Sequence, residues 1–493
     1  MLRTISSAIM LLLLLLTSLG VQRAPPADTE AERVEQIIAA MDTRARVGQL
    51  FMIEFVGAFT SDADTVAELI GDYGVGTVIL GWHNNNILND QPDTPVQVAG
   101  MTNRLQAYVY RQHRQQTEDG DTYFLPLFIA VDHEGDGYPR THLRTGFTPI
   151  PSAMAIGATW SEQEAEQVGK IIGQELRAVG VNMLLGPVLD VLADPHPEGK
   201  GDMNIRVFGG DPHWVGQLGR AYIRGVHEGS DGKVLTVAKH FPGHGASDRY
   251  PDDEVSTVNK SLDDLMDSDL VPFLEVTRLD ADDVAGMTDA MMPSHIRYRG
   301  FQGDVSQLTS PISLDAVGMD VFFEQPTLAI WRANGGLIVC DSLGVTGLER
   351  FYAPGTQEVP HRTIARDALM AGNDILPILF SVHPNWVSGS VPVIKDTIDY
   401  FAAQYESDSQ FRIRVDDALR HIVAAKLHLY PGLSLEETQV QTVTVDESVG
   451  GSLDVIQETA LAGLTLIYPS RERLQLDKNS RGDRRFARCS GVY

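Results

Sequence analysis

The chain has 493 residues, of which 43% are hydrophobic and 21% charged, a globular composition that excludes intrinsic disorder and leaves room for one large domain or two ordinary ones. The formal net charge of −27 argues against a nucleic-acid partner, because phosphate binding needs an excess of lysine and arginine. The two cysteines, Cys340 and Cys489, predict no disulfide framework.

The first residues of the chain differ from the rest. An apolar run at 9–16 follows a polar stretch with one arginine, and the small residues Ser18 and Gly20 stand at the spacing that a signal peptidase accepts. The run is too short for a comfortable membrane span. We therefore predict a secretory signal over residues 1–24, and hence a secreted, extracytoplasmic protein, with an uncleaved N-terminal membrane anchor as the alternative. The acidic Pro-Pro stretch that follows, 25–33, is predicted to be a linker.

Short apolar runs, rich in β-branched residues, recur along the chain at the length of buried strands. They are Leu50–Phe55, Gly76–Leu80, Leu127–Val131, Val181–Leu185, Leu235–Ala238, Val284–Met287, Gly336–Cys340 and Asp374–Leu379. The sequence therefore predicts eight strands.

Segments with helical spacing separate these runs, and the clearest is Ser161–Ala178, where apolar residues recur on one face. Ser161 and Glu164 predict a capping box at its start. Gly180 stands where a helix end commonly needs a residue in the left-handed conformation. The next predicted strand follows at once.

Strands that alternate with helices predict parallel βαβ units and an α/β fold. Eight such units favour a closed (β/α)8 barrel of the TIM type, which we assign to residues 34–430. An open doubly wound sheet is the alternative, because the order of the strands cannot be read from the sequence.

The pattern changes after the barrel. Residues 431–493 are predicted to be a linker, the truncated start of a second α/β domain and a tail, in which Leu453–Ile467 has the pattern of an amphipathic helix leading into a strand. The basic run Arg481–Arg488 contrasts with the acidity of the rest of the chain. We interpret it as the sign of a reading-frame accident rather than a natural end.

Polar residues gather where strand after strand is predicted to end. In barrels of this kind the reacting groups stand at the carboxyl ends of the strands and in the loops that follow. The segments at these positions are Asp132–Gly135, Gly186–Asp190, Lys239–Gly245, Met292–His295 and Asp341–Ser342. Packing alone does not account for such a repeated pattern, so we expect a site at this end of the barrel.

Two of these segments carry most of the chemistry. Asp341 ends the apolar run Leu337–Cys340, so its carboxylate would face the barrel mouth; the N-cap of a following helix is an equally good interpretation of this stretch alone. Lys239–Gly245 places a fixed positive charge, two imidazoles and a rigid Pro-Gly turn on one loop. Its side chains offer donors to hydroxyl groups.

Lys239–Gly245 reads Lys-His-Phe-Pro-Gly-His-Gly and closely resembles the signature of glycoside hydrolase family 3, particularly its β-N-acetylglucosaminidase branch. The resemblance extends in order over roughly residues 34–430, which would be the catalytic domain. Further segments that resemble the family are Val47–Phe51, Val131–Gly135, Gly186–Asp190 with Arg206 and Phe208, Met292–His295, and Cys340–Leu343.

The resemblance implies an exo-acting, retaining β-glycosidase in which Asp341 attacks the anomeric carbon and forms a covalent glycosyl-enzyme. It also implies that hydroxyls of the terminal sugar are held by Asp132, Arg206, Lys239 and His240. Lysine and arginine near Asp341 would keep its carboxylate ionised. A salt-bridged barrel end is the alternative for Asp132 and Arg206, and His244 is expected to order its loop.

The general acid departs from the family's pattern. The acetylglucosaminidase branch usually supplies an Asp-x-His pair shortly after the Gly-His-Gly turn, and the loop 246–255 contains no histidine. We predict that a loop carboxylate, Glu254 or Asp252, is the general acid/base, in preference to Asp248, whose neighbour Arg249 would hold it ionised. Clustered carboxylates raise one another's pKa, as a general acid requires. A solvated acidic loop is the alternative.

Three classes of function follow from these residues. The first is a β-glycosidase, with β-N-acetylglucosaminide as the first substrate and β-glucoside or β-xyloside as the alternatives. The second is a degenerate barrel that binds carbohydrate without turning it over. The third, a metal hydrolase, would use His133, His240, His244 and Asp341, and it is disfavoured because paired histidines at one strand end are absent. We therefore expect neither a metal nor a cofactor.

Overall fold

The computed structural model describes most of the chain from residue 29 to residue 464. The described residues are 29–58, 61, 65–116, 122–135, 140–192, 203–247, 249–355, 358–379 and 386–464, without the side chains of 386–390. The predicted signal or anchor at 1–24, the candidate Asp248, Cys489 and the basic run near the C-terminus lie outside them.

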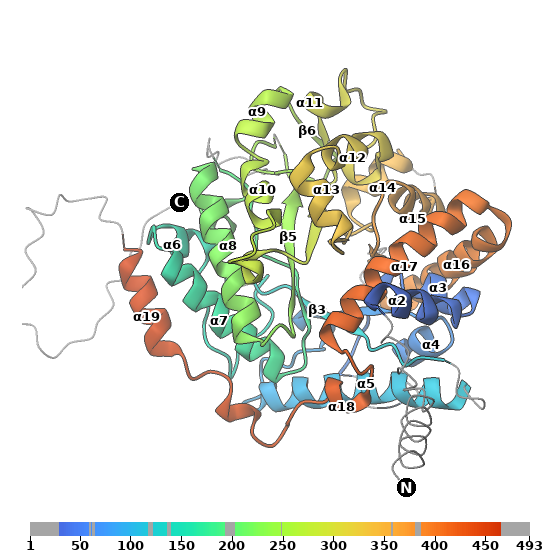
Figure 1. Ribbon diagram of the computed structural model, residues 1–493, viewed down its shortest axis with the longest axis horizontal. Coiled ribbons are helices and arrows are strands. Elements are labelled where there is room, and N and C mark those ends of the chain that lie inside the picture. Colours follow the sequence, from blue (N-terminus) through green and yellow to red (C-terminus); the bar gives the residue numbers. More distant parts are fainter. Residues whose placement is uncertain are drawn as a thin grey trace, which may run out of the picture.

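Eight parallel strands pair with their neighbours in the order β10-β1-β2-β3-β4-β5-β7-β9. Their bounds are β1 Phe51–Glu54, β2 Thr77–Leu80, β3 Phe128–Val131, β4 Met183–Leu184, β5 Leu235–Phe241, β7 Ala290–Pro293, β9 Leu337–Ile338 and β10 Leu376–Pro377. Strands such as β3 and β5 lie inside a surrounding layer of helices (Figure 1). A parallel bridge between Val339 and Ile375 joins the two strands at the ends of this order, so the ring closes. The predicted (β/α)8 barrel is confirmed, and the open sheet is wrong.

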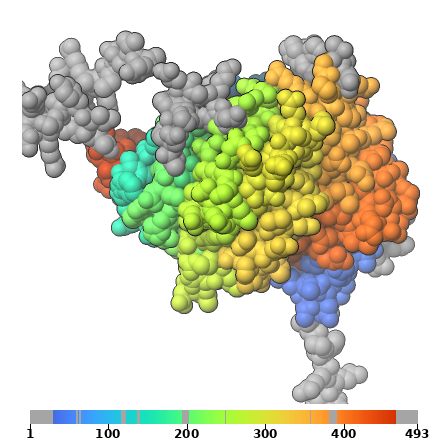
Figure 2. Space-filling view, turned by 90° about the horizontal axis from the view of Figure 1, so that it is seen from above, coloured from blue at the N-terminus to red at the C-terminus, as the bar shows by residue number. Residues whose placement is uncertain are grey.

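The strands read as continuous apolar runs because helices cover the outside of the ring and side chains fill the inside. All four residues of β3 are buried, and its register places Phe128 beside Thr77 and Val131 beside Leu80 on β2. In the space-filling view, successive parts of the sequence lie side by side across the face, as expected of a ring built from consecutive units (Figure 2).

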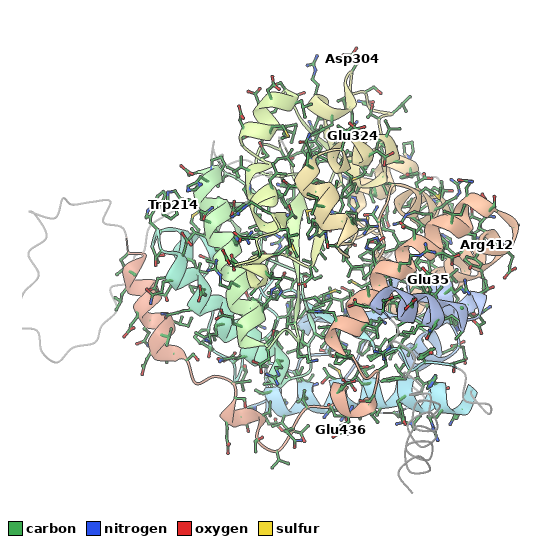
Figure 3. The ribbon with its side chains drawn as sticks, viewed as in Figure 1. Glu35, Trp214, Asp304, Glu324, Arg412 and Glu436 are labelled. Atoms are coloured by element: carbon green, nitrogen blue, oxygen red, sulfur yellow. The ribbon has the colours of Figure 1, made fainter. Side chains whose placement is uncertain are left out.

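Helices and short 3-10 turns surround the ring. The helices are α2 Glu30–Ala39, α3 Thr43–Gly48, α4 Thr65–Gly71, α5 Thr94–Gln116, α6 Ala153–Gly157, α7 Glu162–Ala178, α8 Pro212–Gly229, α9 Leu262–Asp267, α10 Val271–Thr277, α11 Arg299–Gln302, α12 Ala316–Phe323, α13 Pro326–Ala333, α14 Thr346–Tyr352, α15 His361–Met370, α16 Trp386–Ser407, α17 Ser409–Leu429, α18 Leu435–Thr438 and α19 Leu453–Ala462. The 3-10 turns are η1 Trp82–Asn84, η2 Asn204–Arg206, η3 Val284–Gly286, η4 Ile312–Leu314 and η5 Val445–Glu447. Charged side chains such as Glu35, Arg412 and Glu436 lie on the outside of this shell (Figure 3). No helix in the described part of the chain is long and apolar enough to cross a membrane.

The predicted helix at 161–178 is confirmed as α7. Ser161 is its N-cap and accepts a hydrogen bond from the Glu164 amide, and Gly180 has a φ of +74° just after its end. The predicted capping box is incomplete, because the bond from the Ser161 backbone amide to the Glu164 side chain is not formed. The Glu164 carboxylate instead accepts a hydrogen bond from the Thr459 hydroxyl (2.5 Å), because α19 packs against this corner.

The predicted strand at Val284–Met287 is wrong. These residues form η3 and the turn after it, where Val284 is 56% exposed, and the true strand is β7 at Ala290–Pro293. The guanidinium of Arg220 holds the turn through Asp283, at 2.6 Å between Nε and Oδ2. The buried Ala-Met-Met of β7 has no β-branched residue, so burial between β5 and β9 outweighs local strand propensity there.

The segment after α17 runs along the helical shell of the barrel. Its elements α18 and η5 pack against α5, and α19 packs against α6 and α7 (Figure 1). The amide of Gly450 donates to Glu175 of α7 (2.8 Å). The helix predicted within 453–467 is present as α19, whereas the strand predicted after it falls on residues outside the described part.

Candidate active site

A cavity of about 160 Å³ lies at the carboxyl ends of the strands. All eight strands, or the loops that follow them, contribute to its wall. Its polar residues are Asp132, Glu134, Arg140, Arg206, Lys239, His240, His244, Tyr250, Asp252, Ser294, Asp341 and Ser342. The structure thus brings together every predicted site residue except Glu254.

Asp341 follows β9 and projects into this cavity rather than capping a helix. The N-cap interpretation is wrong, because α14 begins at Thr346 with Val345 in the N-cap position. Burial acts to raise the pKa of Asp341, but the imidazoles of His295 and His240, the amide of Ser342 (2.7 Å) and the ammonium of Lys239 together hold it below its ordinary value. The two imidazoles therefore contribute most to keeping the carboxylate ionised, and Lys239 contributes as the sequence suggested.

A chain of buried charges links three strands on one side of the cavity. The Lys239 ammonium, whose side chain is 4% exposed, lies 2.7 Å from Asp132 and 2.8 Å from Glu134. Glu134 also accepts two hydrogen bonds from Arg206, at 2.7 Å and 3.0 Å. Asp132 and Arg206 are thus both ion-paired and presented to the cavity. Burial would raise the pKa of Glu134, but the two cations hold it far below its usual range.

Asp190 fixes the two histidines of the Lys239–Gly245 segment. It is fully buried, lies 2.8 Å from Nδ1 of His240 and accepts a hydrogen bond from the His244 amide (2.6 Å). This contact leaves Nε2 of His240 as the ring nitrogen that can face a ligand. Burial lowers the pKa of His244 to about 4, so that ring is neutral, as suits the loop-ordering role expected for it.

His295 supports the turn that carries Asp341. Its Nε2 lies 2.8 Å from the carbonyl oxygen of Ser342, and its Nδ1 lies 2.7 Å from the hydroxyl of Ser313. The two bonds fix the ring between the segment after β7 and the segment after β9. His295 therefore both holds the backbone next to Asp341 and contributes to the low pKa of that carboxyl.

The two candidate acids on the loop after β5 face different surroundings. Asp252 lines the cavity, and burial together with the negative charge of Asp341 raises its pKa, although a hydrogen bond from Tyr250 opposes the rise. Glu254 is 60% exposed, pairs with Arg249 (2.8 Å) and lines a separate surface hollow beside β6 (Ser256–Val258) and β8 (Ile296–Tyr298). The structure therefore brings Asp252 and Asp341 together, and it does not bring Glu254 to the cavity.

Sequence reasoning did not assign roles to several residues of this wall. Glu134 and Asp190 stand in the polar segments after the third and fourth strands, and this position could have marked both as candidate site residues. Arg140 and Tyr250 lie in irregular loops, where no local pattern marks them. Their place in the wall follows only from the folding of distant segments onto one another.

The residues required by the metal-hydrolase alternative do not form a metal-binding group. Across the described ranges, no cluster of three or more His, Cys, Asp or Glu side chains is placed to hold an ion. His133, which that alternative included, is buried, and burial lowers its pKa to about 4. His240 is committed to Asp190 through its Nδ1.

Comparisons with known proteins show which proteins the chain is similar to. The sequence profile described as Glycosyl hydrolase family 3 N terminal domain matches residues 42–425. Beta-hexosaminidase A of Pseudoalteromonas piscicida is 29% identical over 303 residues, which cover 60% of this chain and 46% of that protein. The beta-hexosaminidase of Thiobacillus denitrificans is 38% identical over 181 residues, which cover 35% of this chain and 45% of that protein.

Solved structures show the same relationship. The chain is similar to a glycoside hydrolase family 3 beta-N-acetylglucosaminidase from Paenibacillus sp. str. FPU-7, with a TM-score of 0.66 and 25% identity. That similarity covers 87% of this chain and 70% of the other. By contrast, the chain spans about half the length of the curated relatives it matches.

Proposed function

The chain belongs to glycoside hydrolase family 3, and we propose that it is an exo-acting, retaining β-glycosidase that removes terminal β-linked N-acetylglucosamine. In this proposal Asp341 is the nucleophile and Asp252 is the general acid/base. Asp252 protonates the glycosidic oxygen while the Asp341 carboxylate attacks the anomeric carbon. Asp252 then takes a proton from the water that hydrolyses the glycosyl-enzyme and releases Asp341.

The observation that carries this proposal is the pair of carboxyls with opposite pKa shifts in one cavity. Imidazoles, an amide and a lysine keep Asp341 ionised, as a nucleophile must be. Burial and the charge of Asp341 keep a proton on Asp252 to higher pH, as a general acid must. When the surroundings of two carboxyls push their pKa values apart, the carboxyl with the higher pKa suits the role of acid and the other the role of nucleophile or base.

The charged wall beside these carboxyls supports the binding of a sugar. Asp132, Lys239 and Arg206 present acceptors and donors whose positions are fixed by ion pairs, between Lys239 and Asp132 and between Arg206 and Glu134. His240 adds a ring nitrogen oriented by Asp190. In the proposal these four side chains hold hydroxyls of the terminal sugar, and Glu134 holds the two cations in place without needing to touch the substrate.

The substrate follows from the relatives. Those closest in sequence among the proteins described above are named beta-hexosaminidases, and the structural relative is named a beta-N-acetylglucosaminidase. A β-N-acetylglucosaminide is therefore the substrate to test first, before β-glucoside and β-xyloside. Because of the signal predicted at 1–24, we also propose that the enzyme acts outside the cytoplasm.

A panel of nitrophenyl β-glycosides tests the proposal with the full chain and three variants. We expect the N-acetylglucosaminide to be turned over fastest and Asp341→Asn to abolish turnover. Asp252→Asn should lower kcat/KM by at least about 100-fold for a substrate whose leaving group needs protonation. Glu254→Gln is the matched control, because it removes a carboxylate from the same loop outside the cavity.

Each other outcome excludes part of the proposal. Equal activity of Asp341→Asn and the native enzyme would exclude Asp341 as the nucleophile. A loss confined to Glu254→Gln would transfer the acid/base role to that residue. Sugar binding without any hydrolysis by the native chain would favour the carbohydrate-binding barrel, and a preference for glucoside or xyloside would change the substrate alone.

A further inference from the structure

We propose that Tyr250 and Gly347 are positioning residues that together fix Asp252 over the cavity. The inference rests on the proposed function, because it concerns how the acid/base of that reaction is held. Tyr250 acts on the side chain of Asp252, and Gly347 acts on its backbone. Asp252 is then a fixed acid, although it lies in a loop without regular secondary structure.

The side-chain contact runs from Arg140 through Tyr250 to Asp252. The guanidinium of Arg140 donates a hydrogen bond to the Tyr250 hydroxyl, which in turn donates to the Asp252 carboxyl. Burial, followed by the charge of Asp252, raises the pKa of Tyr250 to about 12. The hydroxyl therefore keeps its proton in the range where a glycosidase works, and it remains a donor to Asp252.

The backbone contact comes from the first turn of α14. The amide of Gly347 donates to the carbonyl oxygen of Asp252 (2.8 Å), and Arg350 of the same helix donates to the carbonyl oxygen of Asp253 (2.9 Å). A Cβ atom at position 347 would lie 2.3 Å from the carbonyl oxygen of Pro251. Any side chain larger than hydrogen there must push the loop away, because real Cβ atoms essentially never approach backbone so closely.

Both carboxyls of the proposed reaction are consequently tied to one βα unit. Asp341 follows β9, and the helix after it, α14, holds the loop that carries Asp252. The amide of Leu343, which lies between Asp341 and α14, donates to the carbonyl oxygen of Pro377 in β10 (3.0 Å). The separation of the carboxyls is therefore set by a packed element of the barrel, and not by the freedom of a loop.

This arrangement matters because a retaining reaction needs its two carboxyls at a defined separation. A displacement of about 1 Å at such a site costs on the order of 100-fold in rate. Loss of correct placement should harm proton donation more than nucleophilic attack, since it is the acid that the two contacts hold. The two steps can be told apart by varying the leaving group of the substrate.

The experiment compares kcat/KM of Gly347→Ala for two N-acetylglucosaminides. One carries a dinitrophenyl leaving group, which departs without a proton, and the other carries an alkyl group, which needs one. We expect about a 100-fold loss with the alkyl substrate and less than about a threefold loss with the dinitrophenyl substrate. Gly451→Ala is the control, because nothing lies within 4 Å of a Cβ there.

Tyr250→Phe gives an independent readout through pH. The lost hydrogen bond stabilised the ionised form of Asp252, so the pKa of Asp252 should rise and the basic limb of the kcat/KM profile should move to higher pH. Tyr430→Phe, which removes a buried hydroxyl bonded to Asn182 (2.9 Å) away from the cavity, should leave that limb where it is.

Equal losses with both leaving groups in Gly347→Ala, or an unmoved basic limb in Tyr250→Phe, would overturn the inference. Should Gly347→Ala fail to fold, Arg350→Met is the substitute, because it removes the hydrogen bond to Asp253 without adding an atom beside Pro251. We expect it to show the same difference between the two leaving groups, but a smaller one. Asp252→Asn separates the two proposals. If Asp252→Asn loses more activity with the alkyl substrate than with the dinitrophenyl substrate, and the positioning variants do not, only the positioning inference fails. If Asp252→Asn loses activity equally with both substrates, the proposed function fails.

Discussion

Burial and, after it, the carboxylate of Asp341 across the shared cavity raise the pKa of Asp252, while His295 and His240 lower the pKa of Asp341 itself against the effect of burial. As pH rises, Asp341 therefore loses its proton at a lower pH than Asp252 does. Neither has this property because of its residue type. It comes from what the barrel packs around each of them.

The first prediction concerns pH. Activity should fall as pH drops, because Asp341 becomes protonated, and it should fall again as pH rises, because Asp252 loses its proton. With a substrate whose leaving group needs protonation, Asp252→Asn should be slower at every pH, retain the acidic limb and lose the basic one. The measurement is kcat/KM across pH for both proteins, and a basic limb that persists in the variant would assign that limb to another group.

The second prediction concerns Glu134, whose side chain is 4% exposed between two cations. Glu134→Gln leaves Lys239 and Arg206 buried without their shared counter-charge. We expect it to cost about 3–5 kcal/mol of unfolding free energy in urea and to raise KM. Glu35→Gln, which removes an exposed partner of Arg420, should cost less than about 1 kcal/mol. Equal stability of the two variants would show that the buried pairs contribute no more than a surface pair.

The third prediction concerns Asp374, a fully buried carboxylate before β10. It accepts hydrogen bonds from Arg332 (2.8 Å), Arg414 (2.8 Å) and the Ile338 amide (2.9 Å). Burial would raise its pKa, but the two guanidinium groups lower it to about 2. Asp374→Asn should therefore lower the free energy of unfolding by about 3–5 kcal/mol.

Asp417 provides the control for that prediction. It also contacts Arg414 (2.9 Å), but its side chain is 49% exposed. Asp417→Asn should cost less than about 1 kcal/mol, because water screens and replaces the lost contact. The native ion pairs of Asp374 should persist until pH falls toward 2, whereas the stability that they contribute should be lost progressively as pH falls from the unfolded pKa of about 3.9 through the folded value.

The fourth prediction concerns Lys426, which is fully buried and donates to Gln49 (2.6 Å) and to the carbonyl oxygen of Gly76 (3.2 Å). Burial lowers its pKa to about 7. Between that value and the unfolded value near 10.4, the unfolded chain binds more protons, so the free energy of unfolding should rise with pH by up to ~1.4 kcal/mol per unit.

Lys426→Met should remove that slope, because the variant has no proton to gain on unfolding. The measurement is urea unfolding at several pH values from 7 to 9 for both proteins, and the difference between their slopes isolates the lysine from all other groups. Parallel slopes would mean that Lys426 titrates in the folded protein as it does in water.

The barrel could be predicted from the sequence because a parallel strand that is covered on both sides must be a short apolar run. Seven of the eight runs lie where the structure has strands. The remaining run, Val284–Met287, was misplaced. The true strand β7 is buried but contains no β-branched residue, whereas the β-branched Val284 is exposed in a turn. Polar segments after the strands could also be predicted to gather, because parallel strands deliver their carboxyl ends to one face.

The sequence by itself predicted the parallel strands and placed Asp341, Asp132, Lys239 and His240 at their carboxyl ends, because a buried parallel strand is a short apolar run whose end can be located. The closure of these strands into a ring was decided by the tertiary structure. Only the tertiary structure decided that Asp252, and not Glu254, enters the cavity, and that Glu134 and Asp190 are the partners of Lys239 and His240. The direction of a side chain in an irregular loop depends on what packs against the loop. For Asp252 that contact is Gly347, which is distant in sequence, and no local pattern of residues records it.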